Sequence, residues 1–345
     1  MYGAKQVIMV GDPNQLPPTV ISRVAANSNY NKSLFSRLVT VNSPYLLNIQ
    51  YRMHPEISKF PSERFYGSRL KNGPSMDAVN HQPWFKERIF KPYIFFSVVD
   101  SIESKSITKS LSNTVEAKFV VNLVNTLLQR YSIGHGGKAN ASKQKTSFKN
   151  QICIVSPYKE QIQLIRSLFI KKFGSTILET VSVETVDSFQ GQEKTIIIFS
   201  CVRSSSKSTS IGFLRDFRKL NVALTRGKSN MWIVGNDNML INDKLWGSLI
   251  RDAEQRGCKM TKAFFEKIKN TNEEEAKNID NKFLSINSNN KETIEPINKK
   301  QVDDSKNLQS YKGRCVDEGI EYEDDGCGLT SKFKDLDIQK SVVTK

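Results

Sequence analysis

Residues 183–204 read VETVDSFQGQEKTIIIFSCVRS and residues 212–236 read GFLRDFRKLNVALTRGKSNMWIVGN; these two stretches decide the fold. Each pairs an apolar run of strand length with a polar loop rich in Gly, Gln, Glu, Thr and Arg. Apolar strands position polar groups at their ends, where ligands bind in open α/β sheets, so we expect such loops to hold a ligand. Arg226 lies between a helix-like segment and a strand, where a guanidinium can contact a phosphate. The alternative is a surface arginine near a helix end.

Apolar runs alternate with helix-like patterns over the first 260 residues. We expect strands at residues 5–10, 45–50, 93–99, 152–155, 195–201 and 230–234, and helices at 33–39, 55–66, 113–130, 156–172, 214–224 and 239–256. Asn113 and Glu116 form a capping-box pattern, and Ser156-Pro157 suits the start of the next helix. The alternation predicts an α/β fold whose mainly parallel sheet is covered by helices on both faces.

Charge is distributed unevenly along the chain. The net charge is +16 overall, but residues 271–345 carry −4, which leaves +20 on residues 1–270. A folded body this basic indicates a polyanionic partner, either nucleic acid or an anionic membrane surface. A basic soluble domain without such a partner is the alternative. The last 75 residues are rich in Asn, Lys, Glu, Asp and Ser, a composition typical of disorder.

Cysteine usage and hydropathy exclude several classes of protein. The five cysteines form no C-x-x-C pair, so we expect neither a disulfide framework nor a metal site, and the pattern favours a reducing compartment. The longest apolar run is about eight residues, far short of the ~20 that cross a bilayer. We therefore expect no membrane span.

Four segments, in this order, resemble the motifs of superfamily 1 helicases of the Upf-like group. They are GDPNQLPP at 11–18, QYRMHP at 50–55, VDSFQGQEK at 186–194 and NVALTRGKS at 221–229. Their order and spacing make the resemblance specific. It covers residues 3–257, and the ending LWGSLIRDAEQRG at 245–257 favours the senataxin branch.

The resemblance implies a RecA-like P-loop NTPase fold with two motor domains. Residues 1–43 would be the last part of the first RecA-like domain and residues 44–260 the complete second one. Residues 261–345 would form a disordered polar and acidic tail.

Three residues are expected to be catalytic. Two prolines after Gln15 stiffen its loop, so that the amide can sense a terminal phosphate or its attacking water; a rigid turn without a ligand is the alternative. The resemblance gives Gln15 this coupling role and places Arg52 on the γ-phosphate. It makes Arg226 an arginine finger, a role worth about 10³–10⁵ in rate in related phosphoryl-transfer systems.

Other residues are expected to contact ATP. The resemblance assigns Asp12, Tyr51, Gly191 and Glu193 to the nucleotide, with Tyr51 stacked on adenine. Glycine lets a backbone approach a ligand closely, and the Glu193 carboxylate can accept from a ribose hydroxyl.

Nucleic-acid contacts are expected at a second set of residues. The resemblance implies that Ser156, Pro157, Tyr158 and Thr185 contact a single strand. Free N–H groups at a helix start suit a phosphate, while a simple N-cap at Ser156 remains the alternative.

The 345 residues contain neither G-x-x-x-x-G-K-[ST] nor an assignable Mg²⁺-binding carboxylate of the motor type. The resemblance places both upstream, so we expect ATP with Mg²⁺ as cofactor, a separate N-terminal RecA-like domain as partner, and negligible ATP turnover by this chain alone.

The resemblance also implies a cellular role. It implies 5′–3′ unwinding of RNA or DNA duplexes and RNA–DNA hybrids, nuclear residence, transcription termination as the process, and RNA polymerase II or RNA-processing factors as partners. A nucleic-acid-binding fragment or regulator without ATPase activity is the alternative.

Overall fold

The computed structural model describes residues 3–132, 147–204, 211–269, 271 and 334–335. The chain divides into two compact units. The larger comprises residues 14–16 and 48–272, and the smaller comprises residues 1–13, 17–47 and 273–345. Residues 14–16 therefore belong with the larger unit rather than with the rest of the segment 1–43.

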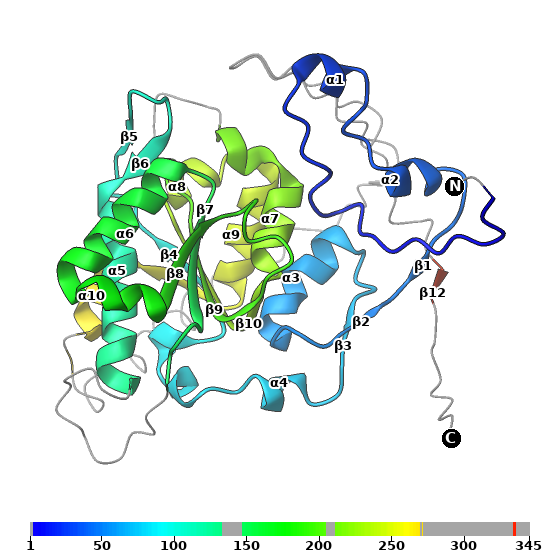
Figure 1. The fold of residues 1–345 in the computed structure, drawn as a ribbon. Helices are drawn as coiled ribbons and strands as arrows, with labels where there is room; N and C mark the ends of the chain where they lie inside the picture. The colour runs from blue at the N-terminus through cyan, green and yellow to red at the C-terminus, as the bar shows by residue number, and fades with distance from the viewer. Residues whose placement is uncertain (1–2, 133–146, 205–210, 270, 272–333, 336–345) are drawn as a thin grey trace, which may run out of the picture. The chain divides into compact units, whose positions relative to one another are not determined.

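A six-stranded sheet forms the centre of the larger unit (Figure 1). Every pairing in this sheet is parallel, as the sequence predicts. Its strands, in spatial order, are β11 (Lys259–Thr261), β4 (Tyr93–Ser97), β10 (Gly227–Gly235), β9 (Lys194–Ser200), β7 (Ile152–Ser156) and β8 (Val181–Thr185).

Helices cover both faces of the sheet (Figure 1). Alternate strand residues point to opposite faces, so each strand supplies two layers of the core. Phe199 of β9 stacks on Trp246 of one layer, whereas Phe96 of β4 contacts Phe119 and Phe265 of the other. The first layer holds α3 (Pro55–Phe65), α7 (Phe217–Leu224) and α9 (Lys244–Gln255), and the second holds α5 (Thr114–Tyr131), α6 (Lys159–Phe173) and α10 (Lys262–Lys269).

Short elements complete both units. Those of the larger unit are β2 (Ile49–Gln50), β3 (Lys71–Asn72), α4 (Met76–Val79), β5 (Glu103–Lys105), β6 (Leu111–Asn113), α8 (Asp237–Leu240) and the 3-10 helices η1 (Pro83–Lys86), η2 (Arg88–Phe90), η3 (Ser175–Glu179) and η4 (Gly212–Arg215). The smaller unit contains α1 (Arg23–Asn27), α2 (Leu34–Leu38) and a parallel pair of strands, β1 (Tyr45–Leu46) and β12 (Lys334–Asp335).

The start of α5 confirms one half of the predicted capping box. The Asn113 side chain accepts a hydrogen bond from the backbone N–H of Glu116 at 3.0 Å. The reciprocal bond is not formed, because the backbone N–H of Asn113 donates to Oε1 of Gln161 at 2.8 Å. The Glu116 carboxylate is therefore available for contacts outside its own helix.

Two other local predictions differ from the structure. Residues 5–10 form no strand, because no described segment pairs with them, and Val7, Ile8 and Val10 are 48–88% exposed. Helix α6 begins at Lys159, with Tyr158 rather than Ser156 at the N-cap, since β7 continues through Ser156.

Helix α10 lies within the stretch 261–345 that was predicted as a tail. Its apolar residues Phe265 and Ile268 are buried against the sheet side of the unit, with exposed fractions of 0 and 3%. Burial of these two side chains orders a segment whose overall composition is polar. Residues 272–333 and 336–345 of the predicted tail lie outside the described residues.

Candidate functional site

The predicted nucleotide-contacting residues of the larger unit gather at the amino ends of β9 and β10. Gly227 at the start of β10 is the register partner of Lys194 at the start of β9, and Lys194 N–H donates to the Arg226 carbonyl at 3.2 Å. The backbone N–H of His54 donates to the Lys228 carbonyl at 2.7 Å, which brings the QYRMHP segment to the same end. Arg226 lies at this amino end between α7 and β10, in the order along the chain that the sequence predicts.

Arg52 links the two motif segments through its guanidinium group. Its Nε donates to Oε2 of Glu193 at 2.5 Å, and its Nη1 donates to the Thr225 carbonyl at 3.1 Å. The backbone N–H groups of Arg52 and Met53 both donate to Oε1 of Gln50, at 2.9 and 2.7 Å. Because the turn and the side chain are both held, a planar donor group is presented in one orientation.

Glu193 is shared between two cations. Its Oε1 lies 2.7 Å from Nζ of Lys228, and its Oε2 accepts from Arg52. Hydrogen bonds from Lys228 and Arg52 lower the pKa of the Glu193 carboxyl, so it is ionised at neutral pH. The predicted ribose contact would use a carboxylate that already orients Arg52.

Arg226 is almost fully buried, with 4% of its surface exposed. Its Nε donates to the Val222 carbonyl at 3.1 Å, and its Nη2 donates to Oε1 of Gln15 at 2.6 Å. Two predicted catalytic residues 211 positions apart are thus in direct contact. The loop that carries Gln15 is held by Asn14, whose carbonyl accepts from Nδ2 of Asn221 at 2.8 Å.

Tyr51 is packed closely against another residue, whereas Gly191 has open space around it. Tyr51 is 67% exposed, and its ring lies so close to Gly73 that a Cβ there would be 2.4 Å from Cδ1 of the ring. Gly191 has a φ of +83°, and a Cβ would meet nothing within 4 Å. The left-handed backbone by itself therefore favours glycine at 191, and the nucleotide contact of this residue stays a prediction. Asp12 belongs to the smaller unit, and its assignment stays a prediction.

The predicted nucleic-acid residues lie at the other end of the sheet. Ser156 and Thr185 are register partners at the carboxyl ends of β7 and β8. Ser156 and Tyr158 are buried, with 0 and 4% exposed, whereas Thr185 is half-buried. Thr185, Pro157 and Lys159 are therefore more accessible to a nucleic-acid strand than Ser156 is.

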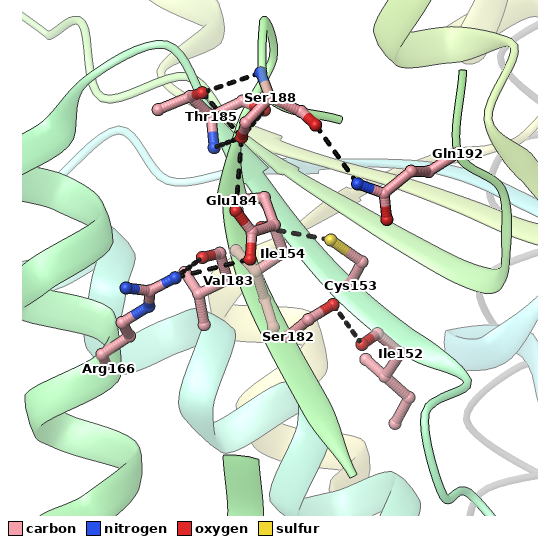
Figure 2. Close-up of polar contacts among 10 residues, drawn as sticks. All are labelled: Ile152, Cys153, Ile154, Arg166, Ser182, Val183, Glu184, Thr185, Ser188 and Gln192. Atoms are coloured by element: carbon pink, nitrogen blue, oxygen red, sulfur yellow. Dashed lines mark hydrogen bonds and ion pairs between the residues drawn. The ribbon is translucent and has the colours of Figure 1, made fainter. Parts of the chain in front are cut away.

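A compact turn follows Thr185 (Figure 2). The Thr185 hydroxyl donates to the Ser188 hydroxyl at 2.8 Å and accepts from the Ser188 backbone N–H at 3.0 Å. Ser188 also donates to Oε2 of Glu184 at 3.2 Å, and Gln192 donates to the Ser188 carbonyl at 3.2 Å (Figure 2). This turn begins the segment of residues 186–193, which connects the nucleic-acid end at Thr185 to the nucleotide end at Glu193.

A buried polar network beside the carboxyl end of β9 was not predicted. The Glu116 carboxylate accepts from the Ser200 hydroxyl at 2.6 Å and from the backbone N–H of Val202 at 2.9 and 3.0 Å. Val202 has a φ of +71°, an unfavourable value for a β-branched residue. Burial raises the pKa of Glu116 to about 8. Only a search for an acidic residue on the apolar face of a predicted helix could have drawn attention to Glu116.

Two negative findings concern the described ranges alone. In residues 3–132, 147–204 and 211–271, apart from residue 270, no group of three His, Cys, Asp or Glu side chains could hold a metal ion. Within these same ranges, no helix has both the length and the apolar character that crossing a bilayer requires.

Comparison with known proteins gives a consistent result. A family model described as an AAA domain matches residues 30–238. The chain is 46% identical over 258 residues to "Helicase SEN1" of Saccharomyces cerevisiae and 47% identical over 257 residues to "Helicase sen1" of Schizosaccharomyces pombe. It is 35% identical over 271 residues to "Probable helicase senataxin" of Homo sapiens.

The matched region is most of this chain but only a small part of each relative. It covers 74, 74 and 75% of this chain but only 11, 14 and 9% of the three relatives. The match thus spans only a small part of the length of these curated proteins.

Proposed function

Because the chain belongs to the AAA domain family of Upf1-like superfamily 1 helicases, with Sen1 and senataxin as homologues, we propose that it is the C-terminal motor half of an ATP-dependent 5′–3′ RNA/DNA helicase. The observation that carries this proposal is the meeting of Gln15, Arg52 and Arg226 at one end of the sheet. Arg52 is hydrogen-bonded to the residue directly before Arg226, and Arg226 is hydrogen-bonded to Gln15.

In the proposed mechanism, a RecA-like lobe that the family places upstream would hold ATP and its Mg²⁺. The phosphates carry the charge that grows in the transition state, and fixed guanidinium groups stabilise it without reorganisation. Arg52 meets the γ-phosphate from its Glu193 pair, and Arg226 exchanges its contact with Gln15 for one with the phosphate. Gln15 is then free to orient the attacking water. Tyr51, Gly191, Glu193 and Asp12 complete the nucleotide contacts.

The opposite end of the sheet holds the single strand. We assign this contact to Thr185 and to the segment Ser156-Pro157-Tyr158, since Ser156 and Thr185 are neighbours in register. The net charge of +20 on residues 1–270 favours a polyanion. Nuclear residence, RNA–DNA hybrids as substrates, transcription termination, and RNA polymerase II or RNA-processing factors as partners belong to the same proposal and follow from the family.

The ATPase role is tested in a two-lobe protein, in which this chain follows the phosphate-loop lobe that the family places upstream. Arg226→Ala should reduce nucleic-acid-stimulated ATP hydrolysis by about 10³-fold or more. Arg64→Ala serves as the matched control, because Arg64 is an exposed arginine in the last turn of α3. Equal hydrolysis by the Arg226→Ala variant and the unchanged protein refutes the assignment.

A second candidate function is a binding module or regulator that holds nucleic acid without turning over ATP. The basic charge of residues 1–270 favours it, independently of the arginine geometry. The isolated chain should bind single strands with an affinity that falls steeply as salt rises. It should also show negligible ATP turnover, and robust hydrolysis by the chain alone contradicts this candidate.

A further inference from the structure

The phenyl ring of Phe213 is held in an outward position between two buried neighbours. Phe213 is 54% exposed, whereas Ile211 and Leu214 are 4 and 3% exposed. The Leu214 carbonyl accepts a hydrogen bond from Nε1 of the buried Trp246 at 2.8 Å. The backbone on both sides of Phe213 is therefore anchored in the core while the ring points to solvent.

Gly212 brings this backbone close to the start of α6. Its φ is +56°, and a Cβ there would lie 2.8 Å from Nη1 of Arg203 and 3.2 Å from Oη of Tyr158. No larger residue fits the position without displacing these groups. The close approach places the Phe213 ring 5.8 Å from the Tyr158 ring at an angle of 67°, an edge-to-face contact.

A lysine completes the surroundings of the ring. Nζ of Lys219 lies 5.0 Å from the Phe213 centroid and 3.5 Å from Oδ2 of Asp187. Asp187 is two residues beyond Thr185, and Tyr158 is two residues beyond Ser156. Phe213 thus contacts one of the two segments assigned to the nucleic-acid strand through Tyr158, and Lys219 bridges its ring to Asp187 beside the other segment.

An exposed aromatic ring with a neighbouring cation is the pairing that proteins use to bind single strands: the ring stacks on a base and the cation attracts the backbone. We propose that Phe213 is a stacking platform for one base of the bound strand, with Lys219 beside it as the phosphate-facing cation. This inference rests on the proposed function and adds to it a specific contact with a base. The ring recognises the π-face that all bases share, so it holds the strand without selecting a sequence.

The inference is tested by fluorescence anisotropy with the full chain and two labelled oligonucleotides of equal length and charge. One is a uniform single strand, and the other has abasic sites at every position. Phe213→Ala should weaken binding of the base-containing strand by about tenfold, and it should leave binding of the abasic strand unchanged. The slope of affinity against salt should stay the same, because no phosphate contact is lost.

Val79→Ala is the matched control for loss of exposed apolar surface. Val79 is 70% exposed and lies on α4 of the same unit. This variant should bind both oligonucleotides as the unchanged chain does. Circular dichroism of each variant confirms that the fold is kept.

Phe213→Trp gives a direct optical signal. All three tryptophans of the chain, Trp84, Trp232 and Trp246, are fully buried. A tryptophan introduced at 213 is therefore the solvent-exposed one, and stacking on a base should quench its emission. The variant should retain the affinity of the unchanged chain for the base-containing strand.

The outcomes separate this inference from the proposed function. If the unchanged chain binds neither oligonucleotide at low salt, the proposed strand contact and the inference both fail. If the unchanged chain binds but Phe213→Ala binds the base-containing strand equally well, or loses affinity for both strands alike, only the inference is overturned. Unquenched emission from the Phe213→Trp variant in the bound state also overturns it.

Discussion

The guanidinium group of Arg52 donates to the carbonyl oxygen of Thr225 across 3.1 Å, and Thr225 directly precedes Arg226. The positions of the two arginines are therefore coupled through one peptide group. A displacement of either segment changes the spacing between both guanidinium groups and any shared phosphate. Functional tests of Arg52 and Arg226 should consequently be read together, since their effects are not expected to add.

Arg52→Lys should impair ATP hydrolysis in the two-lobe protein by at least about tenfold. A lysine keeps the charge but lacks the planar fork that contacts Glu193 and Thr225 at once. The free energy of unfolding should change by less than about 1 kcal/mol, because the pair is partly exposed. Steady-state hydrolysis and urea denaturation measure the two effects. Full activity in the lysine variant would show that charge alone is sufficient.

Glu193→Gln should have little effect on stability. The Glu193, Arg52 and Lys228 side chains are 39, 34 and 43% exposed, so solvent screens both ion pairs. We expect a loss of less than about 1 kcal/mol in the free energy of unfolding. The KM for ATP in the two-lobe protein should rise, because Arg52 loses a partner that orients it. A large loss of stability with an unchanged KM would assign Glu193 to the fold instead.

Stability should fall as pH rises from about 4.5 towards about 8, owing to Glu116. Burial raises the pKa of this carboxyl to about 8, so the folded chain binds a proton more tightly than the unfolded chain does. The stabilisation is fully present below the pKa of Glu116 in the unfolded chain. It is lost as the pH rises to the pKa of Glu116 in the folded chain, at up to about 1.4 kcal/mol per pH unit.

Glu116→Gln is the matched variant for this pH dependence, because an amide imitates the protonated acid but does not titrate. Urea denaturation at several pH values should show a smaller fall in stability over this window for the variant than for the unchanged chain. Parallel pH profiles would mean that Glu116 does not titrate in the window.

Two glycines should respond differently to alanine. At Gly191 the added Cβ meets nothing, so only the left-handed backbone is penalised, by about 1 kcal/mol. At Gly227 the Cβ would lie 2.4 Å from the backbone oxygen of Asn230, at the register shift of β10. Overpacking against backbone should cost about 3 kcal/mol. Urea denaturation compares the two variants, and equal losses would contradict the steric argument.

Local sequence patterns correctly predicted several strands and helices of the larger unit. The apolar runs at 152–155, 195–201 and 230–234 became β7, β9 and β10, and the predicted helix at 113–130 became α5 with Asn113 as its N-cap. Each of these elements is specified by its own residues, through strand-length apolar runs or a helical apolar face with a cap. The family motifs then indicated which loops carry the candidate site.

Features that depend on distant partners escaped sequence reasoning. Residues 5–10 read as a strand, but a strand needs a neighbour to pair with. The strand β8 was missed because only Val181 and Val183 of its five residues are apolar, and the helix α10 was missed because it adjoins a strongly polar stretch. Glu116 matches a local capping pattern in the sequence. In the structure, however, its carboxylate binds Ser200 and Val202, which lie 84 and 86 residues away. The contact between Gln15 and Arg226 was equally invisible.

The connection from β8 to β9 is short and spans the length of the sheet. Residues 186–193 leave β8 at Thr185 and enter β9 at Lys194 without an intervening helix, and they cross from one end of the parallel sheet to the other. The register of β7 with β8 and β9 sets this path at ~22 Å, and nine peptide steps reach at most ~31 Å. The side chains of Val186 and Phe189, within this connection, are buried in the core. Because the connection is anchored at both ends and at these two buried residues, a movement at Thr185 is constrained by the position of Glu193.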